Sequence, residues 1–344
     1  MFSKNLKKLV RLGLIATLIA IVLNLLTIAP PHQPQPSNLI KGVWLTHSGN
    51  SFLNYTTTID NVFHRLSRLN FNRVYISVYN KGTIYPSQYG LRNHQVSLPK
   101  TDPLNAAIKQ GKRQGLKIYA WYEYGMMLNK NELLGKQHPD WLLTTNDGTQ
   151  LVNNNLWLNP AHPEVERYWL NLLTEVAAKY PELSGIQLDD HWGIPQAFGN
   201  HQLEMSNLTR KAIEAVRKVN SNLTISVSPN SYNFALKNYN QDWLRWVKEK
   251  LVDEIIVQIY RPTATEVAKH LAASGINIAS QYVPVAVGIY TGDPRKRKSL
   301  TEIAEQVSVV KKYNYGYSLF CWEYLFTPLH NSSKEAREEV FKAK

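Results

Sequence analysis

The chain has 344 residues, and its 39 lysines and arginines outnumber its 26 acidic residues to give a formal net charge of +13. Its one cysteine, Cys321, excludes an intrachain disulfide framework and a lipid-modified cysteine near the N-terminus. The length fits one large barrel or two ordinary domains.

The first residues are typical of a targeting segment. Residues 1–11 carry four basic residues and no acid, and an almost unbroken apolar run follows at 12–29. The run is near the lower length limit for crossing a hydrocarbon core of about 30 Å. Because Thr27-Ile28-Ala29 before two prolines is a poor cleavage site, we predict a signal-anchor at 1–29, with a cleaved signal peptide as the alternative. The remainder would then be exported and membrane-anchored, or secreted if the signal is cleaved.

A Pro-rich linker is predicted at 30–38, and one folded domain at 39–344 because no second linker occurs. Without the four basic residues of the N-terminal arm, 35 basic against 26 acidic residues leave +9 on this domain. An exported basic domain favours an anionic polysaccharide as partner over nucleic acid. Attraction to membrane lipid is the alternative. Membrane contact is expected through the N-terminal helix, and no obligate protein partner is indicated.

Strand patterns and helix patterns alternate along this domain. Strands are predicted at 41–46, 72–79, 117–124, 185–190, 223–228, 254–260, 283–289 and 316–323. Helices are predicted at 57–69, 103–115, 164–179, 202–220, 240–250, 264–274, 300–313 and 333–342. Eight such pairs predict the α/β class and a (β/α)8 TIM barrel with a long β3-α3 loop. An open doubly wound sheet is the alternative, but the Gly-rich phosphate motifs typical of it are absent from the sequence.

In a TIM barrel, the residues at the carboxyl ends of the strands form the site. The fourth predicted strand ends in Asp189-Asp190, where the alternation of side chains places Gln187 and Asp189 on one face. A plain turn or a helix cap is the alternative for such a pair. The other strand ends supply carboxylates, amides, phenols and indoles, a set that suits sugar rings and their hydroxyls.

The long loop from Tyr124 to Pro163 is predicted to form a lid or subsite wall, with a decorative insertion as the alternative. A hairpin is expected in it, with 140–143 and 149–152 flanking an Asp147-Gly148 turn. Among the tryptophans, Trp44 and Trp121 are assigned to the core, whereas Trp192 and Trp322 at strand ends are candidate sugar platforms.

Metal-dependent and serine-nucleophile chemistry are not indicated. The ten histidines show no spacing that brings two or three to one ion, and no G-x-S-x-G motif occurs. His191 is therefore assigned to substrate binding or to support of the Asp pair. We expect neither a metal nor another cofactor.

Several motifs in order resemble the bacterial glycosyl hydrolase-like 10 family. They are Lys41 to Thr46, Val74 to Tyr79 followed by Tyr85-Pro86-Ser87, Leu116 to Trp121, His138 to Trp141, Trp157 to Pro160, and Gly185 to Asp190. The resemblance spans about residues 39–325 and implies a TIM-barrel glycosidase of the cell envelope. For some members it implies action on peptidoglycan strands stripped of peptides.

Two mechanisms remain open at this point. In the first, Asp189 attacks the anomeric carbon and Glu123 or Glu323 protonates the leaving oxygen. In the second, the 2-acetamido group of the substrate is the nucleophile, Asp189 orients it and Asp190 is the acid. The adjacent Asp pair resembles that of the O-GlcNAc-cleaving hexosaminidases, and the second mechanism is preferred for an N-acetylated substrate.

The predicted function is therefore cleavage of a bacterial envelope polysaccharide, such as N-acetylated, peptide-free peptidoglycan strands. The alternatives are a polysaccharide-binding barrel without catalysis and a glycosidase of a neutral α-glucan. The candidate catalytic residues are Asp189, Asp190, Glu123 and Glu323. The candidate substrate-binding residues are His47, Tyr79, Tyr124, Trp157, Gln187, His191, Trp192, Asn230, Gln258, Tyr260 and Trp322.

Overall fold

The structure is a computed structural model that describes residues 11, 13–15, 18, 29–49, 59–93, 101–293 and 295–342. The predicted signal-anchor at 1–29 lies outside these residues except at 11, 13–15, 18 and 29. Within the described part of the chain, no helix combines the length and the apolar character needed to span a membrane.

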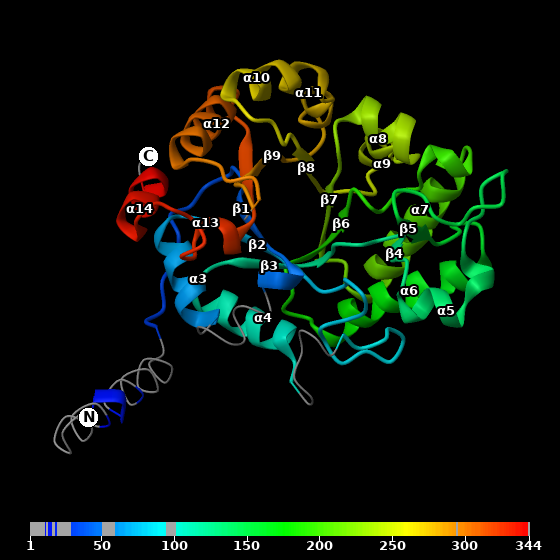
Figure 1. The fold of residues 1–344 in the computed structure, drawn as a ribbon, viewed down its shortest axis with the longest axis horizontal. Coiled ribbons are helices and arrows are strands. Elements are labelled where there is room, and N and C mark those ends of the chain that lie inside the picture. Colours follow the sequence, from blue (N-terminus) through cyan, green and yellow to red (C-terminus); the bar gives the residue numbers. More distant parts are fainter. Residues whose placement is uncertain are drawn as a thin grey trace, which may run out of the picture.

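Eight parallel strands close into a barrel in the order β1-β10-β9-β8-β7-β6-β3-β2 (Figure 1). The strands are β1 (Lys41–Leu45), β2 (Arg73–Ser77), β3 (Lys117–Tyr122), β6 (Gly185–Asp189), β7 (Thr224–Ser228), β8 (Glu254–Gln258), β9 (Val285–Tyr290) and β10 (Gly316–Phe320). Each corresponds to a predicted strand, and each neighbouring pair is parallel. The predicted TIM barrel is confirmed.

Helices surround the barrel (Figure 1). They are α3 (Ile59–Arg68), α4 (Pro103–Arg113), α6 (Pro163–Lys179), α7 (Gln202–Val219), α8 (Tyr232–Tyr239), α9 (Trp243–Lys248), α10 (Ala264–Ala273), α11 (Ile276–Ala279), α12 (Leu300–Lys312), α13 (Trp322–Leu325) and α14 (Lys334–Lys342), with a short 3-10 helix at Gln196–Phe198. Three of them were not predicted. Residues 232–239 form α8, which ends at Asn240 in the left-handed conformation, residues 276–279 form α11, and the last predicted strand stops at Phe320 because 322–325 form α13.

Aromatic side chains fill the inside of the barrel. Trp44 and Trp121 are fully buried there, with ring centroids 6.3 Å apart, as the core assignment predicted. Toward the amino ends of the strands, the Glu254 carboxylate accepts hydrogen bonds from Tyr75 (2.9 Å) and Tyr119 (3.2 Å). The Arg73 guanidinium lies 2.9 Å from the same carboxylate. A buried charge needs such partners, so this group closes the floor of the barrel.

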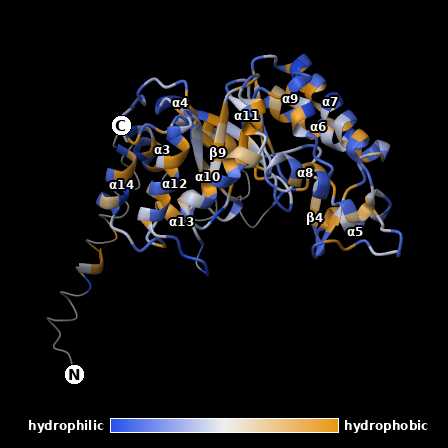
Figure 2. Cartoon of the chain, turned by 90° about the horizontal axis from the view of Figure 1, so that it is seen from above, coloured by the Kyte–Doolittle hydropathy of each residue, from blue (hydrophilic) through white to orange (hydrophobic). Residues whose placement is uncertain are grey.

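A second apolar layer lies between the barrel and the helices. Figure 2 shows apolar residues concentrated on the strands and on the inward sides of the helices. α6 and α7 bury Trp169, Leu172, Met205 and Leu208 toward the barrel, with polar side chains outside. This packing holds the strand ends at fixed positions around the mouth.

The long loop after β3 carries a small two-stranded sheet. β4 (Met127–Asn129) pairs antiparallel with β5 (Asn155–Trp157), and α5 (Leu133–Gln137) and a 3-10 turn at Pro139–Trp141 lie between them. The predicted turn around Asp147-Gly148 is present, but segments 140–143 and 149–152 are not its paired strands. The reason is that Leu143 donates its N–H to the Trp157 carbonyl and Val152 pairs with Asn155. The loop reaches α8 through a hydrogen bond from Asn153 to Tyr239.

The Pro-rich segment lies against the barrel instead of standing away from it. The Gln114 side chain donates to the Pro30 carbonyl (3.1 Å), and His32 lies 2.7 Å from the Ser67 hydroxyl. The backbone N–H of Gln35 donates to Asn70. Residues 29–35 therefore form a strap along α3 and α4.

Candidate active site

Asp189 and Asp190 differ sharply in environment although they are adjacent. Asp189 ends β6, and its side chain is 6% exposed, whereas that of Asp190 is 22% exposed. Ser228 donates to Asp189 Oδ1 at 2.8 Å, and Gln258 donates to the same oxygen at 2.9 Å. Asn230 donates to Asp190 Oδ2 at 2.9 Å. The inner carboxylate is thus fixed by β7 and β8, and the outer one faces the mouth.

The inner carboxylate retains a proton to unusually high pH. Burial and then the charge of Asp190 raise the pKa of Asp189 to about 7, although the hydrogen bond from Ser228 acts in the opposite direction. Two carboxylates this close do not ionise independently. The pair therefore holds one proton near neutrality.

His191 lies beside both carboxylates. Its Nδ1 is 3.2 Å from Asp190 Oδ1 and 3.6 Å from Asp189 Oδ2, and it donates to the Glu123 carbonyl at 3.1 Å. Burial alone would lower its pKa, but Asp190 and Asp189 raise the pKa of His191 to about 9. The imidazolium is therefore the cation that compensates the Asp pair at neutral pH.

Aromatic rings and amides complete the rim. Tyr260 stands over the mouth next to Phe320, with 5.5 Å between ring centroids, and burial followed by Asp189 and Asp190 raises the pKa of its phenol well above the usual value. The Tyr124 ring centroid is 6.1 Å from that of His191. These rings give the site an aromatic wall that suits a sugar ring. The amides of Asn230 and Gln258 hold the Asp pair, and both N–H groups of Gln258 are already donated, to Asp189 and to the Ser228 carbonyl.

A second pair of carboxyl groups lies beside the first. Ser77 donates to Glu123 Oε2 at 2.6 Å, and the backbone N–H of His47 reaches the same oxygen at 3.4 Å. Thr46 donates to Glu323, which is 3% exposed beneath the turn after β1. Burial raises the pKa of both Glu123 and Glu323. Glu123 is half-buried next to the Asp pair, whereas Glu323 is enclosed, which argues against direct proton donation by Glu323.

His47 is present at the site as a neutral ring. Burial, followed by the charge of Lys81, lowers the pKa of His47 to about 4. Its Nδ1 lies 3.5 Å from the Asn93 amide. It is suited to a hydrogen bond with substrate and not to charge pairing.

Five residues predicted to bind substrate are buried away from the open mouth, and that expectation is corrected. Tyr79 points outward to Tyr168, Gln187 joins Trp44 to Ser226 inside the barrel, and Trp192 donates to Thr209 under α7. Trp322 is 5% exposed in the outer core, and Trp157 is 1% exposed, with its ring centroid 6.4 Å from that of His191. Trp157 therefore supports His191 from behind and offers no open face to a sugar.

Gln241 was not among the residues predicted from the sequence. Its fully buried side chain donates to the backbone carbonyls of Asp189 (2.9 Å) and Trp192 (3.1 Å), so it fixes the turn that carries the Asp pair. No local pattern marks it, because it reaches the site through the left-handed Asn240 at the end of α8. Phe320 was also overlooked as a wall of the site, although its place at the end of the last strand could have indicated it.

Asp189, Asp190 and His191 offer one atom each within 4.8 Å of one another, which satisfies the distance requirement of a metal site. The donors do not fit an ion well. His191 Nδ1 must carry a proton to donate to the Glu123 carbonyl, and Asp189 Oδ1 already accepts two hydrogen bonds. The cluster is better described as a charge-paired triad than as a metal centre.

Solved structures with the same fold include several glycosidases. An endo-1,4-β-D-mannanase from Thermotoga petrophila superposes with a TM-score of 0.60, 12% identity, and coverage of 88% of this chain and 99% of that one. A structure described as a putative α-L-fucosidase from Bacteroides thetaiotaomicron gives a TM-score of 0.60 at 15% identity, over 92% and 97% of the two chains. At these identities the likeness establishes the barrel alone.

Sequence comparison identifies closer relatives. Glycosyl hydrolase DigH of Escherichia coli strain K12 is 25% identical over 269 residues, covering 62% of this chain and 59% of the relative, and DigH of Shigella flexneri gives the same values. The chain therefore matches over less than two thirds of the length of these curated relatives. The model of the family described as "Glycosyl hydrolase-like 10" matches residues 39–216 and 204–308. The chain belongs to the glycosyl hydrolase-like 10 family.

Proposed function

We propose that the protein is a glycoside hydrolase of the bacterial cell envelope that cleaves N-acetylated glycan strands such as peptide-free peptidoglycan. The observation that carries the proposal is the Asp189–Asp190 pair at the carboxyl end of β6, fixed by Ser228, Gln258 and Asn230 and sharing one proton near neutrality. Membership of the glycosyl hydrolase-like 10 family supports the reaction class.

The geometry of the pair favours assistance by the substrate. Inverting glycosidases place their two carboxyl groups about 6.5–9.5 Å apart on opposite sides of the sugar. Oxygens of Asp189 and Asp190 instead approach within 4.8 Å of each other, so these two carboxyl groups do not fit the inverting arrangement. In the mechanism that we favour, neither of them attacks the anomeric carbon, and the 2-acetamido oxygen of the substrate is the nucleophile, as in substrate-assisted glycosidases.

In the proposed cycle, the acetamide N–H donates to Asp189, which stabilises this carboxylate and shifts the shared proton to Asp190. The acetamide oxygen forms a bond to the anomeric carbon while the glycosidic C–O bond breaks, and Asp190 gives its proton to the leaving oxygen. Asp190 then removes a proton from water, whose oxygen attacks the anomeric carbon and releases the acetamide. His191 stays protonated and limits the cost of the negative charge.

Charge and targeting signals support an envelope glycan as substrate. The +9 excess on residues 39–344 suits a polymer that carries carboxylates, as peptide-free peptidoglycan does. The basic arm and apolar run at 1–29 suit an exported, membrane-anchored enzyme. A neutral α-glucan carries no charge, so the excess of basic residues would not contribute to binding it.

The test is incubation of the full chain with peptide-free peptidoglycan strands, chitin oligomers and neutral α- and β-glucans, with products identified by mass. We expect cleavage of the N-acetylated strands, and loss of that cleavage in Asp189→Asn and Asp190→Asn. Glu214→Gln, at an exposed glutamate on α7, is the control that retains activity. Full activity of either site variant would refute the assignment, and binding without cleavage across the panel would favour a non-catalytic barrel.

Glu123 distinguishes the two mechanisms. If Asp189 is instead a covalent nucleophile, Glu123 on the neighbouring strand end is the remaining carboxyl group that could donate the proton. The proposed cycle predicts that Glu123→Gln keeps most of the rate, because Glu123 contacts His191 through its backbone carbonyl. Inactivity of a folded Glu123→Gln variant would favour the covalent mechanism.

A further inference from the structure

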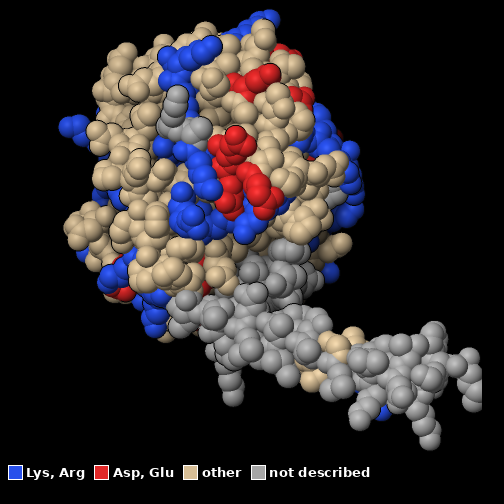
Figure 3. Space-filling model, turned by 90° about the vertical axis from the view of Figure 1, so that its left-hand side faces the viewer, with Lys and Arg blue, Asp and Glu red and all other residues tan. Residues whose placement is uncertain are grey.

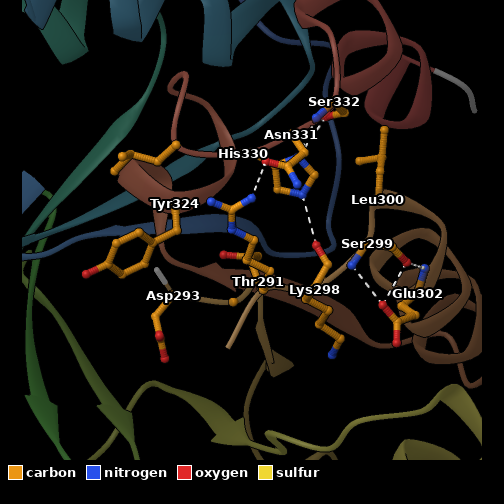
Figure 4. A pocket seen from close by; sticks show the side chains of 13 residues that line it. Thr291, Asp293, Lys298, Ser299, Leu300, Glu302, Tyr324, His330, Asn331 and Ser332 are labelled. Carbon is orange, nitrogen blue, oxygen red and sulfur yellow. Dashed lines mark hydrogen bonds between the residues drawn. The ribbon is translucent and has the colours of Figure 1, made fainter. Parts of the chain in front are cut away.

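A cavity of about 490 Å³ lies beside the candidate active site, between the loop after β9 and the loop that joins α13 to α14. Figure 4 shows Tyr324 and Asp293 toward one end of it, and His330, Asn331 and Ser299 toward the other. In TIM barrels the loops after the seventh and eighth strands, with the N-terminus of a short extra helix, frequently form a phosphate-binding site. β9 and β10 are the seventh and eighth strands of this barrel.

The loop after β9 carries four consecutive basic residues, Arg295 to Lys298. Arg295, Lys296 and Arg297 are exposed, and within the described part of the chain none of the four forms a salt bridge with an acidic residue. Arg297 donates to the Asn331 side chain at 2.7 Å, which orients its guanidinium across the cavity.

The two acids that line the cavity are occupied in building the loop. Asp293 accepts the backbone N–H groups of Arg295 (2.6 Å) and Lys296 (2.9 Å). Glu302 completes the capping box of α12 by accepting from the Ser299 N–H and hydroxyl. Arg297 and Lys298 line the cavity with these two acids, and Arg295 and Lys296 lie next to it on the same loop, so the loop and the cavity wall together carry four cations against two acids. Figure 3 views the molecule from the side of α12 and α14 and shows Lys and Arg side chains beside a central acidic group, with further acidic side chains toward the edges of the view.

Lys298 fixes the inner end of the basic segment. It is 9% exposed, and its ammonium donates to the Arg261 carbonyl and to Gln306. Burial lowers the pKa of Lys298 to about 8, because Glu302 offsets that loss of hydration only in part. An anion in the cavity would supply the missing negative charge.

A row of aromatic rings connects this cavity to the Asp pair. Tyr260 next to Asp189 packs on Phe320, and both pack on Tyr290, with centroid distances of 5.5, 5.7 and 6.5 Å among the three rings. The Tyr290 hydroxyl donates to Asp293 in the wall of the cavity. A glycan chain that follows these rings from the Asp pair therefore reaches the basic segment.

We propose that this cavity and the basic loop at its edge form a subsite that binds a carboxylate on the glycan substrate, through Arg297 in the cavity wall and Arg295 and Lys296 beside it. The proposal rests on the proposed function, which supplies the path of the glycan chain across the site and the carboxylates that it carries. It assigns the basic segment to substrate selection: strands bearing carboxylates bind through the cavity, and neutral strands bind through the aromatic row alone.

The test compares the full chain with two triple variants of equal charge change. The subsite variant is Arg295→Gln, Lys296→Gln and Arg297→Gln. The matched control carries Lys109→Gln, Lys218→Gln and Lys269→Gln, three exposed lysines on α4, α7 and α10. Each is assayed on peptide-free glycan strands and on the same strands with their carboxyl groups reduced to alcohols. Affinities are measured in an Asp190→Asn background, so that the strands are not hydrolysed during the measurement.

Neutralising the subsite should lower kcat/KM and affinity on the carboxylate strands by about tenfold, mainly through KM, since each exposed ion pair contributes modestly. The loss should vanish in high salt. On the reduced strands the subsite variant should match the unmodified protein, and the control should match it on both. Equal losses on both strands, or equal losses in both triple variants, would overturn the subsite.

The two proposals fail in different ways. Cleavage of glycan strands without any effect of the subsite variant would contradict the subsite and leave the proposed function standing. Binding that still follows the carboxylate, with no cleavage of either strand by the unmodified protein, would support the subsite and contradict the proposed hydrolysis. An unchanged melting temperature of the subsite variant verifies that it is folded.

Discussion

Removal of the Ser228 hydroxyl tests how the Asp pair is tuned. This hydroxyl donates to Asp189 Oδ1 at 2.8 Å from a fully buried position, and it acts to lower the pKa of that carboxyl group. A hydrogen bond to a charged group contributes about 1.5–3 kcal/mol. At 1.36 kcal/mol per unit, Ser228→Ala should raise the pKa of Asp189 by about 1–2 units.

The assay is the pH dependence of kcat on N-acetylated glycan strands. Because the active pair holds one proton, the rate should fall as the pH rises through about 7, where Asp189 loses it. In Ser228→Ala this fall should move upward by about 1–2 pH units. The maximal kcat, reached below this pH, should also fall, because a larger fraction of the shared proton then resides on Asp189 instead of Asp190.

The matched control is Ser226→Ala, two residues earlier on the same strand. Ser226 is equally buried, but it accepts from Gln187 and does not contact the Asp pair. Its loss should cost stability and leave the pH profile unchanged. Superimposable profiles for Ser228→Ala and the unmodified protein would refute the reasoning, as would an equal shift in Ser226→Ala.

Three further outcomes follow from buried contacts. Glu254→Ala should lower the free energy of unfolding in urea by about 3–5 kcal/mol, because it leaves the Arg73 guanidinium without its carboxylate partner. Glu254→Gln should destabilise the protein less, and near-native stability of the alanine variant would contradict this prediction. Gln241→Leu should lose about 1–3 kcal/mol and most activity by releasing the Asp189 carbonyl, which unfolding and rate measurements on one sample would check. The raised pKa of His191 adds to the free energy of unfolding; this contribution is fully present below pH 6.5 and is lost as the pH rises through about 9. In His191→Gln, the free energy of unfolding should therefore fall less between these two pH values.

The sequence predicted the architecture because the barrel depends on local, repeated patterns. Each of the eight strands lies at its expected place, and the Asp pair lies at the carboxyl end of β6 as the alternation of side chains required. The helix predicted at 240–250 is shorter, at Trp243–Lys248, and α8 before it was not predicted. The left-handed conformation of Asn240 separates the two helices, and no periodic pattern marks it.

The depth of each side chain could not be predicted in the same way. Alternation correctly placed Gln187 and Asp189 on one face, but it does not tell which layer of the barrel each occupies. Gln187 lies one layer below and binds Trp44 instead of substrate. Tyr79 and Trp192 lie beyond the ends of β2 and β6, so the in–out alternation of a strand no longer determines where their side chains point. Packing against α6 and α7 turns both side chains outward.

The most direct test of the proposed mechanism is a comparison of peptide-free peptidoglycan strands with the same strands after removal of their N-acetyl groups. The full chain is incubated with each, and the products are identified by mass. Hydrolysis assisted by the acetamide predicts cleavage of the acetylated strands, no cleavage of the deacetylated ones, and recovery of cleavage after chemical re-acetylation. Equal cleavage of both strands would contradict the account.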